Sequence, residues 1–210
     1  MHLHPVEFTL DLPLVDPVTL HLRDVPTPVT MERSDQGWRV ALELPPGIYR
    51  YRFSVDDSLF LNDHRRSTQQ PDGDELWSVL KVDPDQGPMW LERPRPTIKE
   101  IQVCRGVSDT FVPLMALEKT RLSDMPITLW LSIENLFSNA FLHVFLLRPD
   151  GALAFGAEYV LDHEWADAEY NARFHIGVQI EPEGFLAGDW SFVVRLEGGQ
   201  TMTKVLGVHR

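Results

Sequence analysis

Apolar and polar residues alternate with a period of two along much of the 210-residue chain. The stretch GIYRYRFSV (47–55) places Tyr49, Tyr51, Phe53 and Val55 on one parity and its arginines on the other. The same alternation occurs in WRVALEL (38–44) and LWSVLKV (76–82). This period is typical of β-strands with one buried face and one solvated face. Because only a Pro-Pro-Gly connection separates 38–44 from 47–55, these two strands are predicted to form an antiparallel hairpin.

The second half of the chain contains seven further candidate strands. They are IKEIQVC, ITLWLSIEN, FLHVFLLRPDG, AFGAEYVL, ARFHIGVQI, GDWSFVVRL and TMTKVLGV. The sequences RPDG and LEGGQ between them are hairpin-type turns. Sixteen prolines are spread over the chain and disfavour helix interiors, so 113–125 is the one segment where a short helix or an irregular loop is expected. The pattern predicts an all-β protein whose second half is an immunoglobulin-like β-sandwich.

Residues 84–97 differ in character from the regions on either side. They contain four prolines, which favour an extended backbone and a semi-rigid linker. We therefore predict a β-sandwich at 1–83, a proline-rich linker at 84–97 and a second β-sandwich at 98–210. Trp90 lies in this linker, where a large apolar side chain is expected to dock onto a domain and fix its orientation.

The charge balance narrows the choice of partners. The chain has 19 basic and 31 acidic residues, a net charge of -12. This excess of acid disfavours nucleic acid and anionic membrane surfaces as principal ligands. Cys104 is the only cysteine, so a buried structural thiol and a reducing compartment are expected. The N-terminal sequence shows no leader pattern and no apolar run reaches membrane-spanning length, which predicts a cytoplasmic protein.

Residues 17–82 carry a family resemblance. The stretch GWRVALELPPGIYRYRFSVDDSLFLND, a turn-rich gap and DELWSVLKV resemble the family 48 carbohydrate-binding module. This is the glycogen-binding module of the β subunit of AMP-activated protein kinase and the N-terminal domain of isoamylase-type enzymes. The positions that match the family pattern are Trp38, Leu44, Pro45, Gly47, Tyr49, Tyr51, Phe53, Val55 and Asp56. The resemblance implies an early-set, immunoglobulin-like fold, and therefore two such sandwiches in tandem.

The resemblance also implies a glucan site at particular residues. Arg52 matches the usual binding cation, Phe60 lies near the position of the stacking aromatic, and Trp77 lies in the closing strand. Sugar recognition needs aromatic faces beside planar polar groups, and these residues supply both types. Other features of the family site are replaced: residues 23–36 contain no aromatic side chain, and Asp57 occupies the turn-glycine position. If Arg52, Phe60 and Trp77 share one exposed face within reach of one sugar ring, the glucan hypothesis stays open. If Trp77 is buried in the core or against the second domain, the hypothesis fails.

Each candidate site has an alternative without a ligand. Arg50 and Arg52 could pair with Glu43 and nearby acidic residues across the strands, exposed contacts worth only about 0–1 kcal/mol each. The loop NDHRRS (62–67), with His64, Arg65 and Arg66, could hold a phosphate or an acidic partner, but a solvated loop is the favoured interpretation. The acidic stretch LDHEWADAEY (161–170) lacks the ligand spacing of a calcium loop, and we interpret it as a surface loop anchored by Trp165.

We find no catalytic motif, no metal site and no cofactor motif in the sequence. The predicted function is non-catalytic recognition of α-glucan or a related carbohydrate by the N-terminal module. The alternative is a protein-interaction or assembly module, in a homodimer or with another protein, that keeps the scaffold without the sugar site. Its interface would use Trp90, Trp130 or exposed sheet edges.

Overall fold

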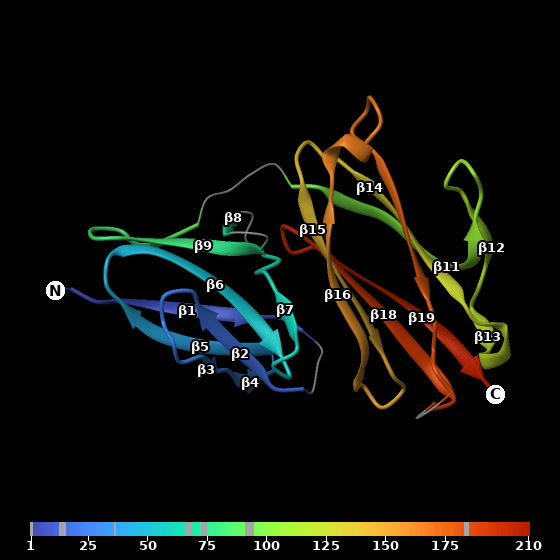
Figure 1. Ribbon diagram of the computed structural model, residues 1–210, viewed down its shortest axis with the longest axis horizontal. Helices are drawn as coiled ribbons and strands as arrows, with labels where there is room; N and C mark the ends of the chain where they lie inside the picture. Colours follow the sequence, from blue (N-terminus) through green and yellow to red (C-terminus); the bar gives the residue numbers. More distant parts are fainter. Residues whose placement is uncertain are drawn as a thin grey trace. The chain divides into compact units, whose positions relative to one another are not determined.

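The computed structural model describes residues 2–12, 16–35, 37–65, 69–72, 75–90, 95–182 and 185–210, with side chains described at all of these except 69–72, 75 and 76. It divides into two compact units, Met1–Arg93 (unit 1) and Pro94–Arg210 (unit 2). In each unit strands pack in layers (Figure 1). The described residues contain no α-helix, and none of their helical segments is long and apolar enough to cross a membrane. The prediction of an all-β protein with tandem sandwiches is confirmed.

Unit 1 contains a small sheet with strand order β1-β5-β4 and a larger sheet with order β10-β9-β6-β2-β3. Two short strands, β7 and β8, pair with β6 and β9 respectively. The strand bounds are β1 His4–Leu10, β2 Val18–Leu22, β3 Val29–Thr30, β4 Glu32–Ser34, β5 Gly37–Leu44, β6 Gly47–Val55, β7 Leu59–Leu61, β8 Gln69–Asp72, β9 Glu75–Asp83 and β10 Gly87–Met89.

The predicted hairpin between 38–44 and 47–55 is wrong, although both strands exist. Strand β5 pairs with β1 and β4, whereas β6 pairs with β2, β7 and β9, so the connection between them crosses from one sheet to the other. Pro45 and Pro46 cannot donate backbone hydrogen bonds, and they favour this change of sheet over a continued ladder. In consequence Glu43 lies opposite Pro5 in the small sheet and not beside the arginines of β6.

The core of unit 1 lies between its two sheets. The ring of Phe8 on β1 lies 4.9 Å from the ring of Tyr51 on β6 in an edge-on contact. Sequence analysis did not assign β1, although its alternating burial gives the same period-two signal as the other strands. The buried apolar residues of the unit include Val6, Phe8, Leu10, Val18, Leu20, Leu22, Tyr51, Phe53, Val55, Leu61, Leu80 and Val82.

Part of the segment assigned to the linker is regular structure. Gly87–Met89 forms strand β10, which pairs with Lys81–Asp83 of β9. Gly87 has φ +77°, a left-handed conformation that glycine adopts without steric cost, and it follows the tight turn at 84–86. The wider segment 84–97 therefore contributes an edge strand to unit 1 as well as connecting backbone.

Unit 2 is built from a four-stranded and a five-stranded sheet, with orders β12-β11-β14-β17 and β13-β19-β18-β15-β16. The chain places β11 and β14 in one sheet, β15 and β16 in the other, returns to the first with β17 and ends in the second with β18 and β19. This is the Greek-key order of an immunoglobulin-like sandwich. The bounds are β11 Thr97–Val107, β12 Pro113–Ala116, β13 Lys119–Arg121, β14 Ile127–Glu134, β15 Ala140–Leu147, β16 Leu153–Leu161, β17 Ala172–Val178, β18 Gly188–Leu196 and β19 Thr201–His209.

One apolar cluster fills the space between these sheets, with members such as Leu131 on β14 and Phe192 on β18. Cys104 on β11 is buried and free, and burial raises the pKa of its thiol, as expected for a structural cysteine. At 113–125 the structure has mainly strands in place of the short helix or irregular loop that we expected. That segment forms β12, β13 and a single 3-10 turn, η1 (Leu122–Asp124), because β13 pairs in parallel with the last strand of the unit.

Candidate functional site

The candidate site lies on the outward face of the larger sheet of unit 1. Strand β6 holds Arg52 on the parity opposite to the buried Tyr51 and Phe53. The register places His21 of β2 directly across from Arg52, and Phe60 of β7 across from Ser54. Tyr51 lies opposite Ser78 of β9, so the outward neighbours of these two residues, Arg52 and Trp77, meet on the other face. Three strands thus bring the predicted residues together.

The three predicted residues make direct contact. The guanidinium carbon of Arg52 lies 5.4 Å from the ring centroid of Phe60 and 5.7 Å from that of Trp77. These distances are within the range of cation–π attraction. Phe60 is 40 % exposed, whereas Trp77 is partly buried. Arg52, Phe60 and Trp77 therefore share one face of the sheet, on which Trp77 is less exposed than Phe60.

Two further residues extend this group, which we call the sheet-face cluster (His21, Arg23, Arg52, Phe60 and Trp77). Arg23 lies with its guanidinium carbon 5.9 Å from the Trp77 ring centroid, and the His21 ring lies 5.2 Å from the Phe60 ring. Sequence analysis did not select His21 or Arg23. The alternation in VTLHLRD (18–24) places both residues on one face of a strand. That this strand lies beside β6 is known only from the sheet order.

His21 is held as part of the sheet. Its Nε2 lies 2.8 Å from the Ser54 hydroxyl on β6. Its pKa is lowered chiefly because burial penalises the charged imidazolium, and the nearby positive charge of Arg52 adds to this effect, whereas Asp57 opposes it. The depressed pKa favours a neutral imidazole, which can both donate and accept a hydrogen bond beside the Phe60 ring.

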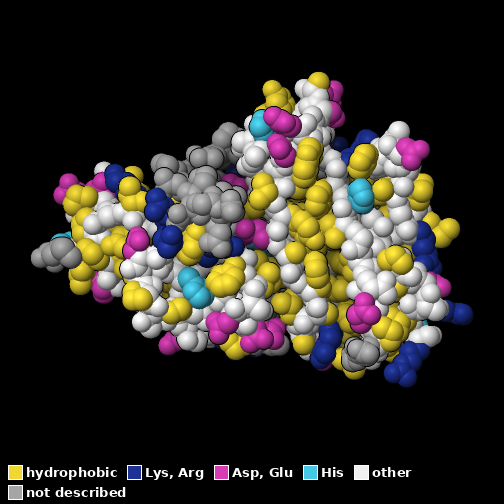
Figure 2. Space-filling model, viewed as in Figure 1, with side chains coloured by type: hydrophobic (Ala, Val, Ile, Leu, Met, Phe, Trp, Pro, Cys, Tyr) yellow, Lys and Arg dark blue, Asp and Glu magenta, His cyan; other side chains and the backbone are white. Residues whose placement is uncertain are grey.

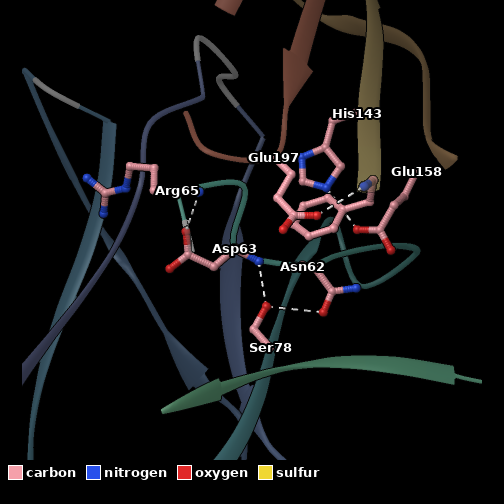
Figure 3. Close-up of polar contacts among 8 residues, drawn as sticks. Asn62, Asp63, Arg65, Ser78, His143, Glu158 and Glu197 are labelled. Atoms are coloured by element: carbon pink, nitrogen blue, oxygen red, sulfur yellow. Dashed lines mark hydrogen bonds and ion pairs between the residues drawn. The ribbon is translucent and has the colours of Figure 1, made fainter. Parts of the chain in front are cut away.

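A buried polar network lies on the opposite side of the same strands. The Tyr51 hydroxyl donates to Asp63 Oδ2 at 2.8 Å, and the Asp63 amide donates to the Ser78 hydroxyl at 2.8 Å. Ser78 in turn donates to Asn62 Oδ1 at 3.1 Å, while Asp63 Oδ1 accepts from the Arg65 amide at 3.0 Å (Figure 3). Tyr51 and Ser78 are the chain neighbours of Arg52 and Trp77, so this network fixes the backbone that carries the outward residues.

The loop after β7 is therefore not the solvated loop that we expected. Asn62, Asp63 and His64 are buried, and the Arg65 guanidinium donates to the Thr9 carbonyl of β1 at 2.9 Å. The physical reason is that the loop carries acceptors that satisfy a buried tyrosine and a buried serine. Arg66, the third residue that we considered for a phosphate site there, lies outside the described residues.

The two tryptophans of the alternative interface differ in exposure. Trp130 on β14 is only 5 % exposed, and its indole Nε1 donates to the Phe111 carbonyl at 2.7 Å. It is therefore not available as a surface residue. Trp90 follows β10 and is partly buried, and it lines a hollow of about 920 Å³ in unit 1 together with Trp38 and Arg39.

The acidic stretch 161–170 also differs from its expected form. Trp165 is 56 % exposed, so it does not anchor the loop in the core. Instead Asp162 caps the 3-10 turn η2 (His163–Trp165) by accepting from the Glu164 amide. Among the described residues no group of three or more His, Cys, Asp or Glu side chains is arranged to hold a metal ion. Acidic and basic side chains are scattered over the face of the molecule shown in Figure 2.

Comparison with known proteins identifies the family that unit 1 resembles. Residues 24–87 match the family model described as the glycogen recognition site of AMP-activated protein kinase. This match confirms the resemblance inferred from the sequence, and it contains Arg52, Phe60 and Trp77 but not His21 and Arg23. The glycogen-recognition match covers the scaffold strands β5, β6 and β9 and ends at Gly87.

The other comparisons find only distant likenesses. No curated protein sequence matches the chain. Among solved structures, an immunoglobulin-like protein from Pseudomonas aeruginosa is 14 % identical with a TM-score of 0.31, covering 52 % of this chain and 97 % of its own. A GH2 β-galacturonidase from Eisenbergiella tayi is 11 % identical with a TM-score of 0.32, covering 97 % of this chain, which spans about a third (34 %) of the enzyme.

Proposed function

We propose that unit 1 binds α-glucan through the sheet-face cluster and that the protein recognises this carbohydrate without transforming it. The observation that carries the proposal is the position of Arg52 between two aromatic rings, 5.4 Å from Phe60 and 5.7 Å from Trp77. The match of residues 24–87 to a glycogen recognition site supports α-glucan as the ligand class.

The chemistry of the cluster suits a sugar ring. Phe60 offers an exposed apolar face on which the C–H face of a pyranose can stack. The guanidinium groups of Arg52 and Arg23 carry planar arrays of donors for sugar hydroxyls, and the neutral imidazole of His21 adds a group that both donates and accepts. Because these groups come from four neighbouring strands of one sheet, binding requires little rearrangement of the backbone.

The cluster differs from the family site in ways that the structure explains. The early loop has no aromatic residue, and Arg23 at its start contacts Trp77 instead. Asp57, in the turn-glycine position, has φ +52° and sits near Ser54, whose hydroxyl lies 3.5 Å from its carboxylate. We infer that two arginines and a histidine replace part of the usual stacking surface. The proposed compartment is the cytoplasm, in keeping with the single free cysteine.

A sedimentation assay on insoluble starch and on glycogen tests this function. The native chain is expected to be retained, and Phe60→Ala, Trp77→Ala and Arg52→Ala are each expected to weaken retention about tenfold or more, since each removes a stacking or donor group. Ile48→Ala is the matched control, because Ile48 lies on β6 with the same parity as Arg52 and is 67 % exposed outside the cluster.

Retention of the native chain together with loss in the three cluster variants would support the proposal. If the native chain is not retained on either polymer, α-glucan is not the ligand. If Ile48→Ala weakens retention as much as Phe60→Ala does, binding uses the sheet in a different way from the one proposed.

A further inference from the structure

Unit 2 contains a pocket of about 840 Å³ that the proposed glucan site does not use. It is formed by the sheet containing β11, β14 and β17 together with two connections, one before β12 and one after β16. Its size is within the range of sites that hold small organic ligands. Two exposed aromatic residues, Phe111 and Trp165, contribute to its lining, one from each connection.

The Phe111 wall is held in a fixed position. Phe111 is 47 % exposed and has φ +58°, a conformation that a bulky residue rarely adopts. Its carbonyl accepts from the indole of Trp130, and the neighbouring Thr110 carbonyl accepts from Arg173 at 3.1 Å. The ring lies 5.5 Å from the His175 ring. Side chains from β14 and β17 therefore stabilise the unfavourable backbone conformation of Phe111, whose ring lines the pocket.

The Trp165 wall is a flat aromatic surface. The Trp165 ring stacks on Phe174, with centroids 6.2 Å apart and planes inclined by only 7°. Trp165 nevertheless remains 56 % exposed, so Phe174 supports the indole and leaves much of it open. A tryptophan stacked on one side and open on the other provides the kind of platform on which a sugar ring packs.

The polar lining is balanced in charge. The lining residues include two basic side chains, Lys99 and Arg173, and two acidic ones, Asp167 and Glu169. Lys99 pairs with Glu134, and Asp167 accepts from the amides of Glu169 and Asn171. The formal charges of the two basic and two acidic lining side chains cancel. This balance disfavours a strongly charged ligand and supplies both donors and acceptors, which suits the hydroxyl groups of a neutral sugar.

We propose that this pocket, with Phe111 and Trp165 as its stacking surfaces, is a second carbohydrate site that binds a neutral oligosaccharide. The proposal does not depend on glucan binding by unit 1, because every group that carries it belongs to unit 2. If both sites are active, one chain carries two separate sugar sites.

The test uses the full chain with Phe60→Ala and Trp77→Ala, which removes the proposed unit 1 site. This variant is applied to an array of neutral α-glucan, β-glucan, xylan, mannan and galactan oligosaccharides, with sulfated and uronic-acid glycans as a separate arm. We expect binding to at least one neutral class. Adding Trp165→Ala is expected to weaken the dissociation constant about tenfold or more.

Two further variants separate ligand contact from folding. Phe111→Asn keeps a residue that tolerates the left-handed conformation while removing the ring, and it is expected to weaken binding as Trp165→Ala does. Phe137→Ala is the matched control, since Phe137 is 48 % exposed and lies outside the pocket. The proposal is overturned if no neutral oligosaccharide binds, if only anionic glycans bind, or if Trp165→Ala has no effect.

Discussion

The aromatic side chains of the two candidate sites are held in different ways. In unit 1, Phe60 and Trp77 lie on strands β7 and β9, and the pleat of one sheet points them to the same face as Arg52. In unit 2, Phe111 and Trp165 lie in connections between strands. The first arrangement follows from strand register, whereas the second follows from bonds made by individual loop residues.

The supporting hydrogen bonds differ in the same way. The sheet-face cluster rests on the buried network of Tyr51, Asp63 and Ser78, which lies on the other side of its strands. The Phe111 wall is supported from the side by Trp130 and Arg173, whose side chains donate to loop carbonyls. Removing a hydrogen bond from the buried network should therefore lower the stability of unit 1 more than removing one of the lateral hydrogen bonds lowers the stability of unit 2.

The largest effect is expected from Asp63→Ala. This change removes the acceptor of the Tyr51 hydroxyl and of the Arg65 amide, and it leaves a buried donor without a partner. We expect the free energy of unfolding of unit 1 to fall by about 2–4 kcal/mol. Native-state hydrogen exchange of the β6 and β9 amides measures this loss locally. Retention on glycogen should also weaken, although no surface residue has been altered.

Asp63→Asn is the control for this prediction, because it keeps a carbonyl acceptor and should cost less than Asp63→Ala. Tyr51→Phe should lower the free energy of unfolding by about 1–2 kcal/mol, since it removes the hydroxyl that donates to Asp63. Unchanged exchange rates at β6 and β9 in Asp63→Ala would show that the network does not support the sheet.

An intermediate effect is expected from Trp130→Phe in unit 2. The change keeps a buried aromatic ring but removes the Nε1 donor to Phe111, so the free energy of unfolding should fall by about 1 kcal/mol. Trp190→Phe is a matched control, because Trp190 is also buried and donates to a loop carbonyl, that of Leu186, at 2.9 Å. Both variants should lose similar stability, but only Trp130→Phe should weaken oligosaccharide binding in the pocket. If both variants bind the oligosaccharide equally well, the hydrogen bond from Trp130 is not needed to hold Phe111 in its binding position.

The same contrast explains what could be predicted from the sequence. Parity alone placed Arg52 outward and Tyr51 inward, because side-chain direction in a strand repeats every two residues. The resemblance of residues 17–82 then supplied Phe60 and Trp77. His21 could not be selected in this way, because its proximity to Arg52 depends on β2 pairing with β6, a contact between residues 31 positions apart. Local alternation does not contain the sheet order, which also explains the wrong hairpin between β5 and β6.

The unit 2 pocket was beyond prediction for a different reason. No period relates Phe111 to Trp165. Phe111 lies outside the strands expected from the sequence, and Trp165 lies in the stretch interpreted as an acidic surface loop. Their positions depend on the left-handed backbone at Phe111 and on the stacking of Trp165 against Phe174. Both are outcomes of tertiary packing. Trp130 shows the opposite case. It alternates with the core residues of ITLWLSI, so its parity predicts an outward, exposed side chain, but it is buried and donates to the carbonyl of Phe111.

The smallest effect concerns His21 and the pH dependence of unit 1. Its pKa is lowered in the folded protein chiefly by burial, so the unfolded chain binds more protons near the ordinary histidine pKa of about 6.5. Stability from this residue is therefore present above that pH and is lost as the pH falls below it. Urea unfolding at pH 7 and pH 5 should show a smaller decrease for His21→Gln than for the native chain. An identical decrease in both would mean that protonation of His21 does not oppose folding.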